Sequence, residues 1–151
     1  LARLGIVPVF GEGTQELSAV YAPDLAEALI AVATSQRTVG KTYPVCHPEV
    51  FTSRTFVQTV GRAVNPARRG LVHVLPLPRW LAVGALGLTG TVARFARQAT
   101  ILTLDKANEF FQPAWTGDPG PLTQDTDWRP SHPLAAGLEL TVTWYREQGW
   151  L

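Results

Sequence analysis

Short apolar runs in the first half of the chain have the character of β-strands. Residues 6–10 and 17–21 are β-prone and flank a Gly-Glu-Gly turn at 11–13. Residues 42–46 have a similar composition, and residues 71–75 alternate between apolar and polar positions. We therefore predict four strands, the last of which is ended by Pro76 and Pro78.

Apolar residues recur at helical spacing between these strands. One helix is predicted to start at Asp24, because Asp24 and Glu27 have the spacing of a capping box. A second helix follows Thr52, which can cap it, with Phe51 and Phe56 placed as a hydrophobic staple. The apolar stripes of the two helices are Leu25, Ala28, Leu29 and Val32, and Phe56, Val57, Val60 and Val64.

The second half of the chain has mainly helical patterns. Residues 80–96 are predicted to form one helix, residues 103–111 a shorter one, and residues 133–149 the last. Residues 112–133 are rich in Pro, Gly, Asp and Thr and are predicted to be an ordered loop. Mixed strands and helices, followed by a purely helical part after residue 78, predict an α/β edge with a small helical lobe.

Composition limits the class of protein. The chain has 151 residues, of which 46% are hydrophobic and 17% charged, which fits one globular domain with a core. It contains no Met, and we expect it to be a fragment of a longer protein. Cys46 stands alone and is expected to be buried in a protein of the reducing cytoplasm. The longest apolar stretch holds 14 residues, fewer than the roughly 20 that a membrane-spanning helix needs.

Charge is unevenly distributed, although the net charge is only +1. No acid occurs between Glu49 and Asp105, a block that contains seven arginines. We favour a solvated face, or one that meets acids elsewhere in the protein. An anionic substrate held by Arg79, or by Arg68 and Arg69, is the alternative. Nucleic-acid binding is not supported, because the chain has no recognised motif and no interleaved aromatic and basic residues.

Three glycines imitate a cofactor-binding motif. Gly84, Gly87 and Gly90 spell G-x-x-G-x-x-G, which could let the backbone approach a pyrophosphate. Only 14 residues separate Gly90 from Asp105, where about 20 are expected before the acid that binds the ribose. We favour glycines that let a helix pack closely, and keep a nucleotide fold over residues 84–105 as an alternative. No metal site is predicted, because the histidines lack ligand spacing; they are His47, His73 and His132.

Several segments, modest one by one, form an ordered set along the chain. They are residues 11–15, 20–21, 24–29, 40–45, 48–52 and 105–107, Trp115, and the ending at 137–151 with Gly137-Leu138, Trp144-Tyr145-Arg146 and Gly149-Trp150-Leu151. Together they resemble the C-terminal, substrate-binding portion of the extended short-chain dehydrogenases/reductases. This family is also called the NAD-dependent epimerase/dehydratase family.

The resemblance implies the outer strands of a Rossmann-like sheet plus a small helical C-terminal lobe. It also implies that the family's glycine motif and its catalytic Tyr-x-x-x-Lys pair precede residue 1, so that NAD or NADP binds mainly outside this chain. No Tyr and Lys of the chain stand four residues apart, the spacing at which the Lys lowers the pKa of the Tyr. We expect the intact protein to be an enzyme and these residues alone to be inactive.

The resemblance bears on the substrate as well. Gln15, Leu17, Tyr21 and Arg79 are the residues we expect to line its pocket. Nucleotide-sugar members of the family usually carry, at the position of Leu17, an Arg that neutralises substrate phosphate. Because Leu cannot do so, an apolar small-molecule substrate is favoured, as in the hydroxysteroid and dihydroflavonol branches. The alternative function is a non-catalytic binding or assembly module that associates through an exposed apolar face, with a homodimer as the expected assembly.

Overall fold

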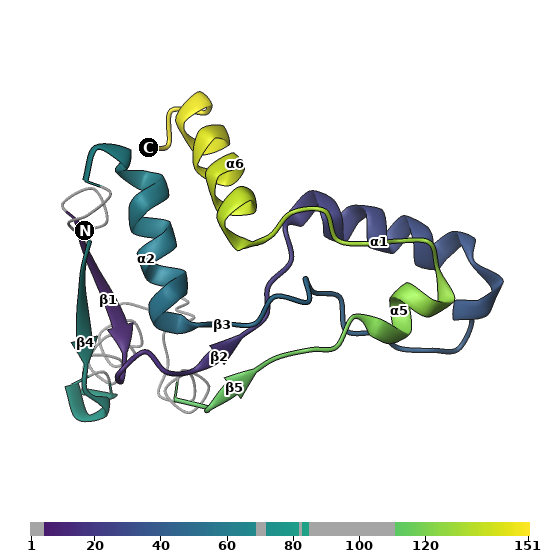
Figure 1. Cartoon of the computed structure of the whole chain (residues 1–151), viewed down its shortest axis with the longest axis horizontal. Coiled ribbons are helices and arrows are strands. Elements are labelled where there is room, and N and C mark those ends of the chain that lie inside the picture. The colour runs from purple at the N-terminus through teal and green to yellow at the C-terminus, as the bar shows by residue number, and fades with distance from the viewer. Residues whose placement is uncertain (1–4, 69–71, 82, 85–110) are drawn as a thin grey trace, which may run out of the picture.

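Two small sheets organise the chain (Figure 1). The computed structural model describes residues 5–68, 72–81, 83–84 and 111–151. In the first sheet, β1 (Ile6–Phe10) runs parallel to β4 (His73–Leu77). In the second, β2 (Glu16–Leu17) lies between the antiparallel β3 (Phe51–Thr52) and the parallel β5 (Ala114–Trp115). The turn from β1 to β2 depends on glycine, since Gly11 and Gly13 have φ of 61° and 78°.

Helix α2 (Ser53–Val64) joins the first sheet to the C-terminal helix α6 (Leu134–Glu147), both of which it contacts. The approach to the sheet is close at Gly61, which is buried. A Cβ placed there would lie 2.7 Å from a methyl carbon of Val72 and 3.2 Å from one of Val7. A larger residue at this position would therefore push helix and sheet apart.

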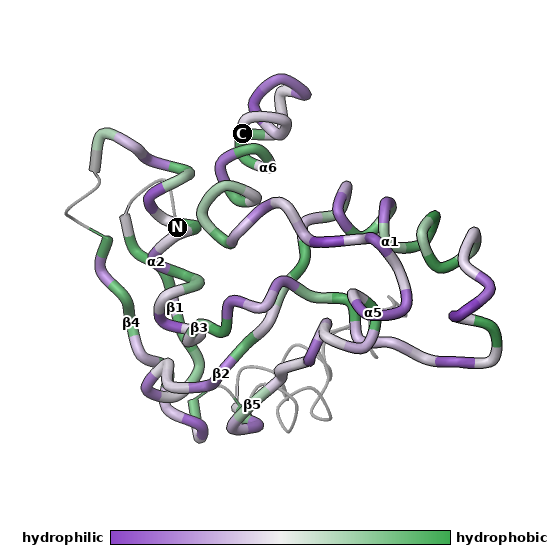
Figure 2. The backbone as a smooth tube through the Cα atoms, turned by 45° about the vertical axis from the view of Figure 1, so that its right-hand side comes forward, coloured by the Kyte–Doolittle hydropathy of each residue, from purple (hydrophilic) through white to green (hydrophobic). Residues whose placement is uncertain are grey.

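Helices α1 (Ala22–Thr34) and α5 (Gly120–Asp125) form an arm that extends away from the sheets (Figure 1). Ala28, Leu122 and Trp128 make its buried core. Short 3-10 turns follow α1 at Gln36–Thr38 and α2 at Pro66–Arg68. Helix α1 includes hydrophobic stretches in Figure 2, and Leu29 and Ile30 on it are 62% and 64% exposed.

The strand predictions are only partly confirmed. Residues 6–10 form β1 as expected, but of the predicted strand 17–21 only the first residue belongs to a strand, β2. Residues 42–46 have no regular structure, and the amide of His47 just beyond them donates to the carbonyl of Ala19. Strand β4 lies two residues later than predicted and continues through Pro76. Proline has no backbone N–H to donate, but it is tolerated in a strand at the edge of a sheet.

The helix predictions fare better at α2 than at α1. Thr52 caps α2 as predicted, its Oγ1 accepting from the amide of Thr55 at 3.1 Å, and the rings of Phe51 and Phe56 stack with their centroids 5.9 Å apart. Helix α1 occurs where predicted, but the capping box is wrong. Its N-cap residue is Tyr21, and no side chain bonds the free amides there.

The second half is not purely helical, contrary to prediction. The expected loop at 112–133 contains both β5 and α5, whereas the final helix is confirmed as α6. Residues 79–81 and 83–84 are helical, but the rest of the helix predicted over 80–96, and nearly all of that over 103–111, lie outside the described residues. Cys46 is buried as predicted and donates from Sγ to the carbonyl of Gly117 at 3.2 Å. Among the described helices, none is both long and apolar enough to cross a bilayer.

Candidate functional site

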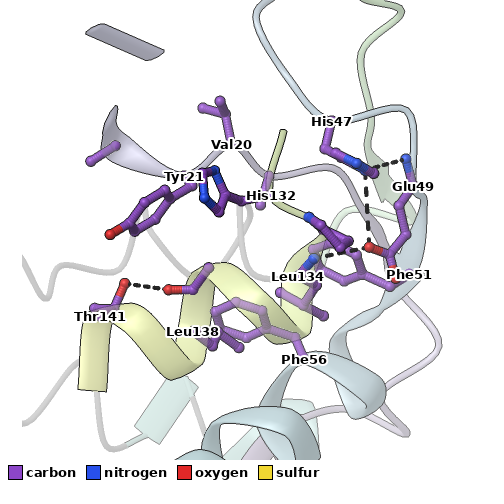
Figure 3. A pocket seen from close by; sticks show the side chains of 14 residues that line it. Val20, Tyr21, His47, Glu49, Phe51, Phe56, His132, Leu134, Leu138 and Thr141 are labelled. Carbon is purple, nitrogen blue, oxygen red and sulfur yellow. Dashed lines mark hydrogen bonds and ion pairs between the residues drawn. The ribbon is translucent and has the colours of Figure 1, made fainter. Parts of the chain in front are cut away.

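A pocket of about 330 Å³ lies where the entry to α1, the loop before β3 and the first turns of α2 and α6 meet (Figure 3). Its wall is mostly apolar. The apolar residues that line it are Ala19, Val20, Ala22, Phe51, Phe56, Pro133, Leu134, Gly137 and Leu138. Tyr21, His47, Glu49, His132 and Thr141 add polar atoms. A mainly apolar cavity with a few placed polar groups is the usual character of a small-molecule site.

A buried carboxylate holds one of the two imidazoles. Asp24 on α1 has a side chain only 2% exposed, and its Oδ1 lies 2.7 Å from Nδ1 of His132. Its Oδ2 accepts from the backbone amides of Ser131 and His132 at 3.1 and 3.0 Å. Asp24 therefore fixes both the ring of His132 and the backbone that leads into α6.

These bonds also set the charge of Asp24. Burial raises the pKa of its carboxyl group, but the hydrogen bonds from His132 and Ser131 outweigh burial and leave the pKa below its ordinary value of 3.8. Asp24 is thus an ionised acceptor near neutral pH. Because a carboxylate can only accept, the proton in the bond to His132 belongs to the imidazole Nδ1.

The second imidazole is held by the backbone beside it. Nδ1 of His47 accepts from the amide of Glu49 at 3.1 Å, and Oε2 of Glu49 accepts from the amide of Leu134 at 2.9 Å. Nδ1 of His47 and Oε2 of Glu49 are 4.0 Å apart, too far for a hydrogen bond. Glu49 thereby places a negative charge at the start of α6, where the helix dipole favours it, and His47 keeps a neutral Nδ1.

Tyr21 completes this side of the pocket. Its ring centroid lies 4.9 Å from that of His132. Gly137 of α6 faces Tyr21, and a Cβ there would lie 3.4 Å from the Tyr21 side chain, an ordinary van der Waals contact. Thr141, by contrast, donates its hydroxyl to the carbonyl of Gly137 at 2.7 Å, within its own helix. The side chains that give the pocket its character are therefore Tyr21 and the two imidazoles.

Of the four residues predicted to line a substrate pocket, only Tyr21 lines this one. Gln15 donates from Nε2 to the carbonyl of Gln112 at 2.7 Å, which ties β2 to the chain before β5. Leu17 lies in β2, opposite Phe51 and Trp115. The guanidinium of Arg79 lies 5.7 Å from the ring centroid of Phe111. The structure does not bring these four residues together at the pocket.

Sequence reasoning missed His132, His47 and Glu49 as site residues. Asp24 and His132 are 108 positions apart, and Glu49 reaches Leu134 across 85. Tyr21, Asp24 and Glu49 lie in segments that carry the resemblance, at residues 20–21, 24–29 and 48–52, whereas His47 and His132 gave no signal. Patterns of local spacing cannot reveal a bond that depends on α6 folding back against the entry to α1.

The basic block does not form one anion site in the described residues. Arg54 donates to the carbonyl of Glu12 at 2.9 Å. Arg62 and Arg146 line a second, more polar hollow of about 430 Å³ with Glu139, but Arg146 donates to the carbonyls of Ala63 and Val64 that end α2. Arg54 thus braces the turn at Glu12, and Arg146, from outside the basic block, caps the end of α2.

Comparison with known proteins places the fold. No family model matches the chain. The UDP-glucuronic acid 4-epimerase of Bacillus cereus, solved with NAD, superposes with a TM-score of 0.62 over 99% of this chain and 39% of its own, at 13% identity. The dTDP-glucose 4,6-dehydratase of Streptomyces venezuelae, solved with NAD and TYD, gives 0.61 over 97% and 36%, at 19% identity. The chain therefore has the mixed α/β fold of the corresponding part of the extended short-chain dehydrogenases/reductases, which confirms the resemblance at the level of the fold.

One curated relative of similar sequence is a different kind of protein. It is the mitochondrial NADH dehydrogenase [ubiquinone] 1 alpha subcomplex subunit 9 of Arabidopsis thaliana, 24% identical over 148 residues. That alignment covers 97% of this chain and 37% of the relative. The chain thus spans little more than a third of the length of the proteins that it matches.

Proposed function

We propose that this chain is the substrate-contacting portion of an NAD(P)-dependent epimerase, dehydratase or reductase, and that it is inactive by itself. The fold match carries this proposal, because it covers 95–99% of the chain but only 35–39% of enzymes such as the NAD-bound epimerase and dehydratases. The pocket beside Tyr21 would then be part of the substrate cavity. In this proposal the chain forms one wall of the substrate-binding site.

The described residues do not fit a dinucleotide site. Residues 83–84 are helical, whereas the first glycine of such a site belongs in a turn between a strand and a helix. Gly87 and Gly90 lie outside the described residues. NAD or NADP would supply hydride transfer when bound to the intact protein, and we assign that binding, and the Tyr and Lys that move the proton, to residues outside this chain.

An apolar substrate is the part of the proposal that this chain's own residues support. Leu17, Phe51 and Trp115 are direct partners across the second sheet and therefore share one of its faces. Phe51 also lines the pocket. By the resemblance, Leu17 of this row stands where nucleotide-sugar members usually carry an Arg, which favours a substrate without a diphosphate. We also propose the cytoplasm as the compartment and a homodimer as the assembly.

A calorimetric titration of the full chain with NAD and NADP tests whether cofactor binding resides outside this chain. We expect no binding of either dinucleotide by these 151 residues and no turnover of carbonyl substrates. The longer protein that we propose to contain this chain should bind one of them and reduce or epimerise a substrate. Tight dinucleotide binding by the chain alone, or an unrelated domain encoded before Leu1, would overturn the proposal.

A non-catalytic assembly subunit is the second candidate. The Arabidopsis relative favours it, because its name makes it a subunit of an NADH dehydrogenase. Several large apolar side chains also lie on the surface, with Trp80 and Trp150 75% and 67% exposed. The intact protein separates the two candidates: an enzyme turns over a substrate when purified alone, whereas an assembly subunit is recovered in a stable complex and shows no turnover.

A further inference from the structure

One residue joins the loop before β3 to the first turn of α6. The backbone amide of Glu49 donates to Nδ1 of His47 at 3.1 Å, and Oε2 of its side chain accepts from the amide of Leu134 at 2.9 Å (Figure 3). All three residues line the pocket. The residue that holds the start of α6 is therefore itself held by an imidazole.

The bond to this imidazole requires a neutral ring. Because Nδ1 of His47 accepts, the ring carries its single proton on Nε2. Histidine side chains ordinarily gain a proton between about pH 8 and pH 5, and both nitrogens of an imidazolium donate. The amide of Glu49 and Nδ1–H of a charged His47 would point at each other, so protonation removes this hydrogen bond.

The carboxylate that holds α6 lies close enough to accept from the new N–H. Oε2 of Glu49 is 4.0 Å from Nδ1 of His47, so a movement of about 1 Å gives a charge-assisted hydrogen bond. The same oxygen accepts from the amide of Leu134. A full positive charge on the ring attracts the carboxylate more strongly than the dipole of an amide does. The carboxylate therefore moves to the ring, and the amide of Leu134 loses its acceptor.

The other imidazole of the pocket responds differently to acid. Nδ1 of His132 already donates to Asp24 at 2.7 Å, so a second proton goes to Nε2 and leaves this bond in place. Asp24, whose pKa is below its ordinary value of 3.8, remains ionised in mild acid. Its Oδ2 also holds the amides of Ser131 and His132. The segment before α6 is therefore fixed at a pH that releases the first turn of α6.

The other groups that face His47 leave this response to Glu49. The titratable side chains that line the pocket with them are Tyr21, at the entry to α1, and His132, before α6. Asp24 lies buried behind His132. Helices α2 and α6 contribute no titratable side chain to the lining, and no Lys or Arg is among the residues that line the pocket.

We propose that His47 is a proton-sensitive latch on the first turn of α6. With a neutral ring it holds Glu49 in reach of the amide of Leu134, and with a charged ring it draws the carboxylate away and loosens that turn. Leu134 is part of the pocket wall, so mild acid opens the pocket on this side. The inference goes beyond the proposed function and applies equally to a portion of an enzyme and to an assembly subunit.

The amide signals of the full chain, followed by ¹H–¹⁵N NMR from about pH 8 to pH 5 beside the histidine ring signals, test the latch. We expect the Leu134 amide to move with the same midpoint as the His47 ring, toward its position in Glu49→Ala, where the acceptor is absent. Its exchange with water, corrected for the intrinsic rate at each pH, should rise about fivefold, as one lost hydrogen bond predicts. The amides of Ser131 and His132 should keep their protection. A Leu134 signal that stays in place while His47 titrates, or that follows the His132 ring, would overturn the proposal.

Asparagine variants assign the response to one ring. The side-chain oxygen of His47→Asn can replace Nδ1 as the acceptor but takes up no proton, so the Leu134 amide should stop responding over this pH range. Two controls should retain the response: His132→Asn, which keeps a donor for Asp24, and His73→Asn in β4, away from the pocket. A response that persists in His47→Asn contradicts the proposal, whatever the controls show. If His47→Asn does not fold, the spectra of the unsubstituted chain still decide.

Discussion

At the scale of single residues, Asp24 shows how a local pattern can hide a distant partner. Its spacing to Glu27 predicts a helix cap, yet its carboxylate bonds to residues more than 100 positions away. The helix starts without a side-chain cap, with Pro23 in its first turn. The same carboxylate orients His132 toward the pocket. A single buried charge therefore links the folding of the C-terminal segment to the geometry of the site.

Asp24→Asn should lower the free energy of unfolding by about 2–3 kcal/mol, since it weakens charge-assisted hydrogen bonds in a buried place. Urea denaturation of the full chain measures the loss. The control is Glu27→Gln, an exposed acid in the same helix, which should change stability by less than about 0.5 kcal/mol. Equal losses in both variants would contradict the tertiary role of Asp24.

The lowered pKa of Asp24 predicts an acid-dependent loss of stability. A carboxyl group whose pKa is lower in the folded state stabilises the protein above its unfolded pKa, and this stabilisation is lost as pH falls through the folded pKa. The loss should therefore begin near pH 3.8, the ordinary value, and continue below it. Urea titrations from pH 6 downward should show a decline that is smaller in Asp24→Asn. Parallel declines in the two proteins would mean that other carboxylates carry it.

At the scale of elements, sequence patterns predicted what depends on near neighbours. The cap and staple of α2 lie within five residues of each other, and both occur as expected. The strand predicted at 42–46 failed because a strand needs a partner, and no local pattern supplies one. Helix α5 was missed because its Gly120-Pro121 start resembles a loop. Likewise, of the pocket only Tyr21 was predicted. The ring of His132 is held by Asp24, 108 positions away, and a pattern of local spacing cannot reveal that bond.

Gly61→Ala tests the packing of α2 against the first sheet. The added methyl would lie 2.7 Å from Val72 and 3.2 Å from Val7, so we expect a loss of about 1–3 kcal/mol despite the better helix propensity of Ala. Thermal unfolding followed by circular dichroism measures it. The control is Gly84→Ala, also helical, where a Cβ would meet no described atom within 4 Å. A Gly61 variant as stable as this control would show that helix and sheet are not in close contact.

At the scale of the whole molecule, α5 packs beside α1 and completes the arm. Asp125 ends α5, where its Oδ2 accepts from Lys41 at 2.6 Å and from the hydroxyl of Tyr43 at 2.7 Å. Its backbone carbonyl accepts from the hydroxyl of Ser35 at 3.0 Å. These contacts span 82 to 90 positions. The arm is therefore held by segments from opposite halves of the chain, around the core of Ala28, Leu122 and Trp128.

The titration of Tyr43 reports whether this closure exists in solution. Burial and the hydrogen bond to Asp125 raise the pKa of Tyr43 to about 12. A raised pKa stabilises the fold below the ordinary value of 10.0, and this stabilisation is lost as pH rises through the folded value. In ¹³C-tyrosine NMR, the Tyr43 ring should ionise near pH 12 in the unsubstituted chain and closer to its ordinary value in Asp125→Asn, while Asp127→Asn, in the same segment, should leave it unchanged. A Tyr43 that ionises at its ordinary pKa in all three proteins would mean that the arm is open, and that the segments around Tyr43 and Asp125 do not meet there.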